Sequence, residues 1–136
     1  MKLQNTTDYG IRVMCILYNK NSLTIAAEIA DELCISYGYL LKVLGCLKEG
    51  GMIEAVHGRL GGYRIAENMR NATLYDIIQV MEGKIKLNTC LNDENYCSQE
   101  TKKKCSVHAV LESTQKKLAS TLNEVTLSQL AGAAGN

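Results

Sequence analysis

The stretch ISYGYLLKVLGCLKEGGMIEAVHGRLGGYRIA, residues 35–66, changes its hydrophobic period near its middle. In its first half, apolar residues recur at steps of three and four: Leu40, Val43, Leu44 and Leu47. This spacing predicts a helix with one apolar face, which begins after Ser36 as its N-cap and ends near Glu49. Gly50-Gly51 follows directly and favours a left-handed C-terminal cap.

The second half of the stretch has a β-type pattern. Two short runs, 52–56 and 63–66, flank the glycine-rich residues 57–62, which indicates a β-hairpin with a glycine-rich tip. A glycine-rich loop can also hold phosphates, but such loops lead into the N-terminus of a helix. This loop leads into a β-type run, which argues against a nucleotide-dependent enzyme.

Two more helices are expected upstream. Thr6 or Thr7 can cap a helix over about residues 8–20, and Thr24 can cap one that reaches Leu33. Their expected inward-facing residues are Ile11, Met14, Cys15 and Tyr18 in the first, and Ile25, Ile29 and Leu33 in the second. Three helices followed by a hairpin is the order of a winged helix-turn-helix, whose third helix lies in the major groove of DNA. The fold class is therefore mostly α with a small β-hairpin.

The candidate DNA contacts are the residues of the third helix that face away from its apolar side, together with the wing. On the helix they are Ser36, Tyr37, Gly38, Leu41, Lys42 and Lys48, and in the wing they are His57, Arg59 and Arg64. An arginine on a bare loop tip can enter a narrow minor groove. Leu41 suits contact with a thymine methyl group or a wider core. Gly38 and Gly45 each lower the stability of a helix by about 1 kcal/mol relative to alanine. Either close approach to a groove wall or close helix packing is needed to explain them.

Composition limits the class of protein. The chain has 136 residues, of which 46% are hydrophobic and 21% charged, as expected for one globular core with an appended helix. The formal net charge of +1 is too small to indicate nucleic acid by itself. No apolar run approaches the roughly 18 residues that span a bilayer, and no signal-peptide core is present, so we expect a cytoplasmic protein without membrane contact.

The segment 84–104 and the residues directly after it contain a candidate ligand set: Cys90, Cys97, Cys105 and His108. The segment lacks the apolar periodicity of a packed element, so packing does not explain these residue types. Thiolates are soft ligands that suit iron–sulfur clusters, zinc or copper(I). Cys105 and His108 are three residues apart at the start of an expected helix, so both project from one face.

Other uses of the cysteines stay open. Structural zinc usually requires short Cys-x2–4-Cys knuckles, and none occurs here. Reactive thiols are the other alternative, because the lysine run 102–104 beside Cys105 would favour a thiolate, although that run is equally a solvated loop face. We rank an iron–sulfur cluster first, ahead of zinc and free thiols. The other three cysteines are interpreted as small core residues: Cys15, Cys34 and Cys46.

A helix is expected over about residues 74–82. A long helix is expected over about 105–123, with a short one after Thr126. Its apolar stripe alternates steps of three and four, close to a heptad pattern: Val107, Leu111, Thr114, Leu118, Leu122 and Val125. A narrow stripe on so long a helix favours pairing with a second copy, and packing on its own domain is the alternative. The expected division is therefore a DNA-binding domain over 1–83 with its wing at about 52–66, a cluster-binding loop over 84–104, and a dimerisation helix with a short C-terminal helix over 105–136.

The whole chain resembles the bacterial winged-helix transcription regulators typified by the iron–sulfur cluster regulator IscR and the nitric-oxide-sensing repressor NsrR, with IscR-like members most similar. The resemblance rests on the cysteine loop and on these segments: KLQNTTDYGIR, ISYGYLLKVLGCLKEGGMI, HGRLGGYRIA, TLYDIIQVMEG, CSVHAVL and NEVTLSQL. It implies a non-enzymatic repressor, a homodimer whose long helices cross, and a palindromic operator on double-stranded DNA. It also implies a redox or nitric oxide sensor.

The resemblance also bears on the cofactor. The spacing of Cys105 and His108 is similar to the IscR pattern, which favours His108 as the fourth ligand and a 2Fe–2S cluster, with a 4Fe–4S cluster as the alternative. In NsrR-like relatives an aspartate at the place of Asp8 can complete a 4Fe–4S cluster from the other subunit. A cluster-free regulator switched by a partner protein or by thiol oxidation is the alternative function, and a zinc-binding protein is another.

Overall fold

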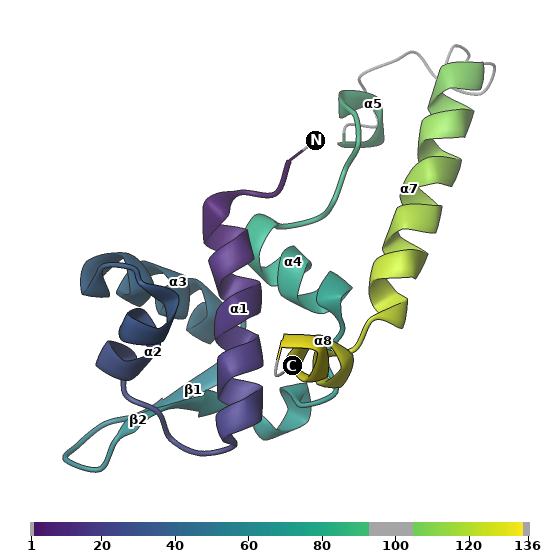
Figure 1. Ribbon diagram of the computed structural model, residues 1–136. Coiled ribbons are helices and arrows are strands. Elements are labelled where there is room, and N and C mark those ends of the chain that lie inside the picture. Colours follow the sequence, from purple (N-terminus) through teal and green to yellow (C-terminus); the bar gives the residue numbers. More distant parts are fainter. Residues whose placement is uncertain (1, 93–104, 135–136) are drawn as a thin grey trace.

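A computed structural model describes residues 2–92 and 105–134 of the protein. Its elements in chain order are α1 (Asn5–Lys20), α2 (Ala26–Leu33), α3 (Tyr37–Glu49), β1 (Ile53–Val56), β2 (Gly62–Ile65), η1 (Glu67–Met69), α4 (Leu74–Glu82), α5 (Thr89–Asn92), α7 (Ser106–Glu124) and α8 (Leu127–Ala134). Figure 1 shows a head built around α1, from which α7 projects. The mostly helical fold with one hairpin confirms the predicted fold class.

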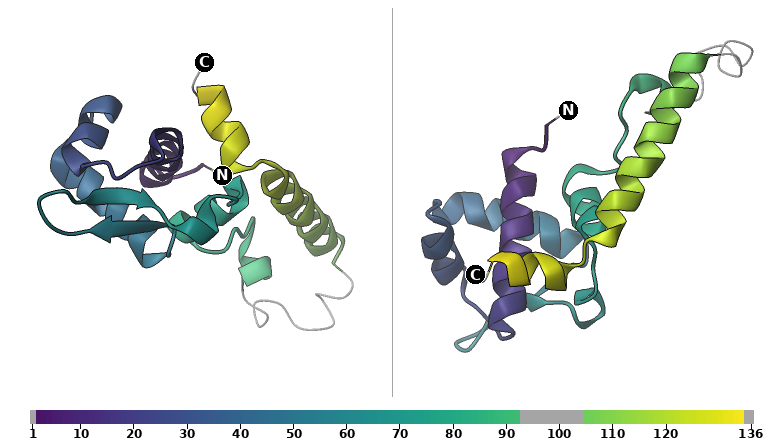
Figure 2. Two further views of the ribbon diagram at one scale, coloured as in Figure 1. Left: turned by 90° about the horizontal axis from the view of Figure 1, so that it is seen from below. Right: turned by 45° about the vertical axis from the view of Figure 1, so that its right-hand side comes forward.

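The core of the head surrounds α1. Helices α3, α4 and α8 and strand β2 all pack against it, and the two views of Figure 2 show them on different sides of α1. Fully buried side chains come from each of these helices: Met14, Leu17, Leu40, Leu44, Leu47, Ile77, Ile78 and Leu127. Leu127 belongs to α8, so the chain returns to the head after α7. Two backbone hydrogen bonds of 2.8 Å fix this return, from Leu74 N to Val125 O and from Leu127 N to Ala72 O.

The helix ends follow the sequence signals in part. The hydroxyl of Ser36 accepts a hydrogen bond of 3.2 Å from Tyr39 N, which confirms the predicted cap of α3. At the other end, Gly51 has φ +73°, and Met52 N donates to Leu47 O at 3.0 Å. This pairing closes the helix as a Schellman motif, so the expected left-handed cap is confirmed with its left-handed residue at Gly51.

The predicted caps of the first two helices are wrong. Helix α1 begins at Asn5 after Gln4, without a side-chain cap, because the hydroxyl of Thr7 donates instead to Glu82 at 2.9 Å. Thr24 lies in a β-bridge with Tyr63, and its hydroxyl donates to Ser22 O at 3.2 Å. Ile25 is therefore the N-cap residue of α2 and is 54% exposed, not buried as expected.

The wing is an antiparallel hairpin in which Ile53 pairs with Ile65 and Val56 with Gly62. Its base is fastened to the loop between α1 and α2, since Thr24 and Tyr63 exchange two backbone hydrogen bonds of 2.8 and 2.9 Å. Gly62 has φ +155°, and a Cβ there would lie 2.9 Å from the carbonyl group of Thr24. Only glycine allows this close approach, so one position of the loop is explained by packing of the wing on the head.

Two short elements were not expected from the sequence, η1 after the wing and α5 within the cysteine segment. The predicted helix over 74–82 is present as α4 and begins with a capping box, in which Thr73 and Asp76 each accept a hydrogen bond from the other's backbone N–H. No helix within residues 2–92 and 105–134 is long and apolar enough to cross a membrane.

Candidate functional site

The outward face of α3 is free of tertiary contacts along most of its length. Tyr37 is 55% exposed and Leu41 is 40% exposed, and the other predicted contact residues of this helix are also exposed: Ser36, Gly38, Lys42 and Lys48. The opposite face is fully buried in the core through the four apolar residues that define its periodicity. Burial of one face therefore fixes which side chains α3 can present to DNA, while the contact itself stays a prediction.

The two glycines of α3 are not explained by packing inside the chain. A Cβ built on Gly38 or on Gly45 would have no atom within 4 Å among the described residues. Close helix packing, one of the two explanations considered for these glycines, therefore does not apply. By contrast, a Cβ on Gly10 of α1 would lie 2.9 Å from the sulfur of Met81, so the core packs closely against that glycine.

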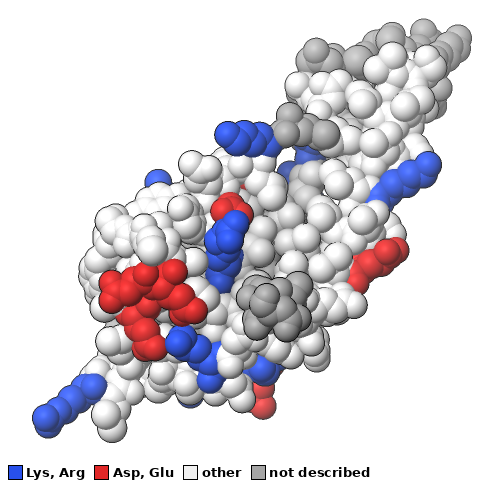
Figure 3. Space-filling model, viewed as in Figure 1, with Lys and Arg blue, Asp and Glu red and all other residues white. Residues whose placement is uncertain are grey.

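The three predicted wing residues are exposed, but their surroundings differ. His57 and Arg59 lie at the tip next to Leu60, which is 90% exposed. Arg64 lies on β2, where its Nε donates to Oε2 of Glu54 on β1 at 3.1 Å. Both partners are about half exposed, so this ion pair is weak and open to exchange with a phosphate. Figure 3 shows a basic side chain extending into solvent at the wing end of the molecule.

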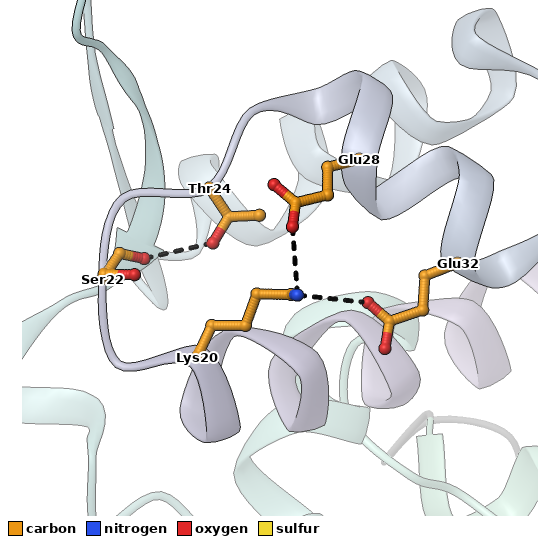
Figure 4. A network of polar contacts seen from close by, with 5 residues as sticks. All are labelled: Lys20, Ser22, Thr24, Glu28 and Glu32. Carbon is orange, nitrogen blue, oxygen red and sulfur yellow. Dashed lines mark hydrogen bonds and ion pairs between the residues drawn. The ribbon is translucent and has the colours of Figure 1, made fainter.

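A cluster of acidic side chains covers α2 on one face of the head (Figure 3). It consists of Glu28, Asp31 and Glu32, and Lys20 at the end of α1 lies against it. Lys20 Nζ is 3.1 Å from Glu28 and 3.8 Å from Glu32, as Figure 4 shows. The hydrogen bond to Glu28, and then the charges of both carboxylates, raise the pKa of Lys20. This face has the same sign of charge as DNA, which disfavours contact with a duplex here.

The described part of the cysteine segment packs beside the start of α7. Cys90 lies in α5 and is buried, with Asn88 Nδ2 3.6 Å from its sulfur. Helix α5 contacts α7, and Leu87 N donates to Oε1 of Gln115 at 2.9 Å. Cys97 and the lysine run 102–104 lie outside the described residues. Among those that are described, no group of three His, Cys, Asp or Glu side chains could hold a metal ion.

Cys105 and His108 form the first turn of α7. Cys105 is its N-cap residue, and its sulfur accepts a hydrogen bond of 3.4 Å from His108 N. The Nδ1 atom of His108 is buried and has no hydrogen-bond partner within residues 2–92 and 105–134. A buried polar nitrogen that stays without a partner costs about 1–3 kcal/mol, so such atoms are normally satisfied by a protein group, water or an ion. Coordination of a metal ion is one arrangement that satisfies such a nitrogen.

Asp8, the alternative fourth ligand, is engaged elsewhere in the same chain. It lies in the first turn of α1, where it is exposed and accepts a hydrogen bond of 3.0 Å from Arg12 Nε. The bond to Asp8 and its charge raise the pKa of Arg12. Cys15 is buried on the same helix, and burial raises the pKa of its thiol, as expected for a core cysteine. The same prediction is wrong for Cys34, which is exposed at the end of α2, and Cys46 is half-buried.

A polar contact network between the cysteine segment and α3 was missed in the sequence. Glu82, the last residue of α4, accepts hydrogen bonds from Gln4 N at 2.7 Å and from the Thr7 hydroxyl at 2.9 Å. The preceding residue, Thr6, has its hydroxyl 3.2 Å from the hydroxyl of Tyr39 in α3. Residues 4–7 thus contact both the last residue of α4, two residues before the cysteine segment, and the helix that is predicted to face DNA. Hydrophobic periodicity carries no signal for these polar contacts.

The helix order, the wing and the exposed face of α3 define a winged helix-turn-helix DNA-binding protein with a cysteine-containing segment before its long helix. Residues 3–133 match the Rrf2 family, described as iron-dependent transcriptional regulators, and the chain belongs to this family. It is a DNA-binding transcription regulator and not an enzyme.

Three similar proteins illustrate the range of the family. The chain is 38% identical to the transcriptional regulator NsrR of Bacillus licheniformis over 100 residues, which is 71% of this chain and 70% of that protein. Its structure is similar to that of CymR, the global cysteine regulator of B. subtilis, with a TM-score of 0.75 and 26% identity over 98% of each chain. It is also similar to T. potens IscR, with a TM-score of 0.72 and 26% identity over 98% of this chain and 88% of that one.

Proposed function

We propose that the protein is a homodimeric repressor whose affinity for a palindromic operator is controlled by an iron–sulfur cluster. Cys90, Cys97 and Cys105 would hold the cluster, with His108 as the fourth ligand. The observation that carries this proposal is the buried Nδ1 of His108, which has no partner within the described ranges and lies one turn from the sulfur of Cys105. The similarity to NsrR and IscR supports the same cofactor class.

The donor set fits the cofactor. Three thiolates and an imidazole suit a 2Fe–2S cluster, and imidazole ligation raises the reduction potential of such clusters. When bound, the cluster would supply reversible electron transfer and reactivity toward small oxidants or nitric oxide. Cys90 is already held against α7 by the contacts of α5, so two of the thiols come from neighbouring elements. The residues around the site would couple the positions of these thiols to the geometry of the head.

The contacts of Glu82 suggest how that coupling reaches DNA. Residues 84–92 follow Glu82 after Gly83 alone, so a change in their path would act on the end of α4 and on this carboxylate. The carboxylate holds the first turn of α1 through Gln4 and Thr7, and this turn contacts Tyr39 of α3 through Thr6. Tyr9 adds an edge-to-face ring contact with Tyr39 at 5.6 Å between centroids. We infer that these contacts fasten the cysteine segment to the head, so that ligand occupancy of the segment changes the orientation of the whole head, and α3 with it, relative to the second copy.

The exposed side of α7 supports the homodimer. Val107 and Val110 are 61% and 63% exposed, an unusual exposure for two neighbouring apolar side chains on one helix face. The face is the expected place for α7 of a second copy, which would place two heads at a separation that matches two half-sites. In functional terms the head is 1–83, the ligand segment 84–104 and the dimerisation part 105–136, although α8 packs into the core of the head.

A second candidate function is a cluster-free regulator switched by thiol oxidation or by a partner protein. The observation that favours it is the structural similarity to CymR, the global cysteine regulator of B. subtilis. A zinc site with the same ligands is the third candidate. The spectrum of the protein distinguishes them, because only an iron–sulfur cluster absorbs visible light.

The test is anaerobic purification of the full chain, followed by visible spectroscopy, iron and sulfide analysis, and operator titration with and without the cluster. We expect brown protein, loss of the colour in Cys90→Ser, and retention of it in the matched control Cys34→Ser, since Cys34 is exposed at the end of α2. His108→Ala should change the cluster spectrum and Asp8→Ala should not. Colourless protein that takes up only zinc, or an operator affinity that is independent of the cluster, would overturn the proposal.

The wing contact has its own test. Arg59→Ala should weaken operator binding and lower the dependence of affinity on salt by about one released counterion. Glu54→Gln is the matched control, because it frees Arg64 without touching the wing tip. Unchanged affinity and salt dependence in Arg59→Ala would exclude Arg59 as a contact.

A further inference from the structure

The outward side of α3 has few of the side chains that usually read bases by paired hydrogen bonds. Such readout uses arginine or lysine for guanine and asparagine or glutamine for adenine. Helix α3, which the structure describes completely, has the sequence YGYLLKVLGCLKE and contains no arginine, asparagine or glutamine. Its cations are Lys42 and Lys48, which can contact guanine or phosphate. Apolar contact with the bases is the other way in which this helix can read sequence.

Leu41 is the apolar group in the middle of this face. It is 40% exposed although it lies on a helix whose other leucines, Leu40, Leu44 and Leu47, are completely buried. Gly38 precedes it by three residues and Gly45 follows it by four, so the three positions lie along one line of the helix surface. Because the glycines have no side chains, the helix backbone is bare on both sides of Leu41, and Tyr37 is its exposed neighbour one turn earlier.

The fold itself does not require glycine at either position. Both have an open surrounding, with no described atom within 4 Å of a Cβ, and neither has a positive φ. Each glycine lowers helix stability by about 1 kcal/mol relative to alanine. An unfavourable residue without a structural reason, on both sides of an exposed leucine and on the helix that faces DNA, indicates that the bare surface is used in binding.

We propose that Leu41 determines specificity by packing against thymine methyl groups in the major groove, and that Gly38 and Gly45 allow the helix backbone to approach the bases closely. This inference rests on the proposed placement of α3 in the groove and adds the base class that it reads. The thymine methyl group is the one apolar feature of the major-groove edges of the four bases, so it is the chemical match for an isolated leucine. Lys42 and Lys48 flank the contact and hold phosphates.

The experiment begins with selection of bound sequences by the full chain from a random duplex library, in the cluster-loaded and the cluster-free state. Each thymine of the selected half-site is then replaced by deoxyuridine, which lacks only the 5-methyl group. We expect at least one replacement to weaken binding about fourfold, the effect of one buried methyl group. Leu41→Ala should lose this discrimination and bind the thymine and deoxyuridine duplexes equally.

Alanine substitutions test the glycines against a matched control. Gly45→Ala and Gly38→Ala should raise the melting temperature and yet weaken binding to the selected duplex at least fivefold. Gly132→Ala is the control, because Gly132 is also helical with open space at its Cβ, but lies in α8. It should raise the melting temperature without changing DNA affinity.

The outcomes separate this inference from the proposed function. Equal affinity for thymine and deoxyuridine at every selected position, or unchanged affinity in both glycine variants, overturns the inference and leaves the proposed function in place. Methyl discrimination that is lost in Leu41→Ala supports the inference even if the cluster has no effect on affinity, a result that would overturn the proposed control by the cluster.

Discussion

Helices α3 and α7 are both amphipathic by sequence, yet they are stabilised differently. Over 13 residues α3 buries four apolar side chains completely in the head. Over 19 residues α7 buries none, although its sequence contains an apolar stripe as regular as that of α3. The C-terminal half of α7 packs on α4, and its N-terminal half has Val107 and Val110 exposed. The same hydrophobic periodicity therefore accompanies complete burial of the apolar face in α3 and incomplete burial of it in α7.

The contrast shows which part of the protein can respond to a signal. The core of the head is complete within one chain, so its geometry changes only at a large cost in free energy. Among the described residues, the start of α7 is contacted mainly by α5, and in the proposed function its position depends on the cysteine segment and on a partner helix. A ligand bound there acts on the least constrained part of the structure and uses the head as a rigid body.

The largest expected effect is on the core of the head. Leu44→Ala should lower the free energy of unfolding by about 2–5 kcal/mol, because it leaves a cavity at a side chain that is completely buried. Leu41→Ala is the matched control on the same helix and should cost about 1 kcal/mol or less. Urea unfolding followed by circular dichroism measures both. Equal losses for the two variants would mean that α3 is not divided into a core face and a free face.

The next effect concerns α7 and should act on assembly instead. Val110→Glu should leave the stability of the head unchanged and raise the dimer dissociation constant at least tenfold, or about 1.4 kcal/mol, since a charge would enter an apolar contact. Ser120→Glu is the control, because Ser120 lies on the polar side of α7 with Glu112 and Lys116. Sedimentation equilibrium measures the constant. A Val110→Glu protein that dimerises normally would exclude this face as the interface.

The same contrast explains what the sequence predicted. Spacing alone placed α3, the hairpin and α4, because burial of one face within one chain is what hydrophobic periodicity reports. For α7 the stripe was recognised, but its residues are divided: Leu118 and Leu122 line a groove of the head, and Val107 is exposed. The pattern could not decide between a partner and the head, since both bury leucine equally well.

Polar contacts between distant residues were not predictable. Thr7 and Thr24 have the residue type of an N-cap, and in both cases a partner far along the chain prevents that role. The sequence predicts the candidate site as a set of ligand types through Cys90, Cys105 and His108, and their role as ligands stays a prediction. Their surroundings were not, because the burial of the His108 nitrogen depends on how α7 meets the rest of the chain.

The hydrogen bond from Thr7 to Glu82 should have an intermediate effect. Thr7→Val removes a completely buried hydroxyl whose partner is a carboxylate, and we expect the free energy of unfolding to fall by about 1–3 kcal/mol. Thr121→Val in α7 is the control, because its exposed hydroxyl bonds only to Lys117 O within its own helix. The control should change stability by less than about 0.5 kcal/mol. Thermal unfolding measures both variants. Similar losses of stability in the two would mean that the Thr7 hydroxyl does not couple α4 to α1.

The smallest expected effects are at the two N-caps. Ser36→Ala removes the hydroxyl that accepts from Tyr39 N, and should destabilise the head by about 1 kcal/mol. Cys105 holds the same position in α7, but its sulfur accepts at 3.4 Å, and cysteine is not among the preferred cap residues. Cys105→Ser should therefore leave the melting temperature of the cluster-free protein unchanged or slightly raised, while it removes a thiolate ligand.

That difference makes Cys105→Ser a clean probe of the cysteine site. Because serine is the better cap, a loss of the visible spectrum in this variant cannot be assigned to unfolding of the first turn of α7. Circular dichroism of the cluster-free wild type and variant should superimpose, and the spectra of the reconstituted proteins should differ. If Cys105→Ser instead lowers the melting temperature as much as Ser36→Ala does, the thiol has a structural role at the start of α7. The start of α7 would then be fixed by its own N-cap, as α3 is fixed by its core, and not by ligands of the cysteine site.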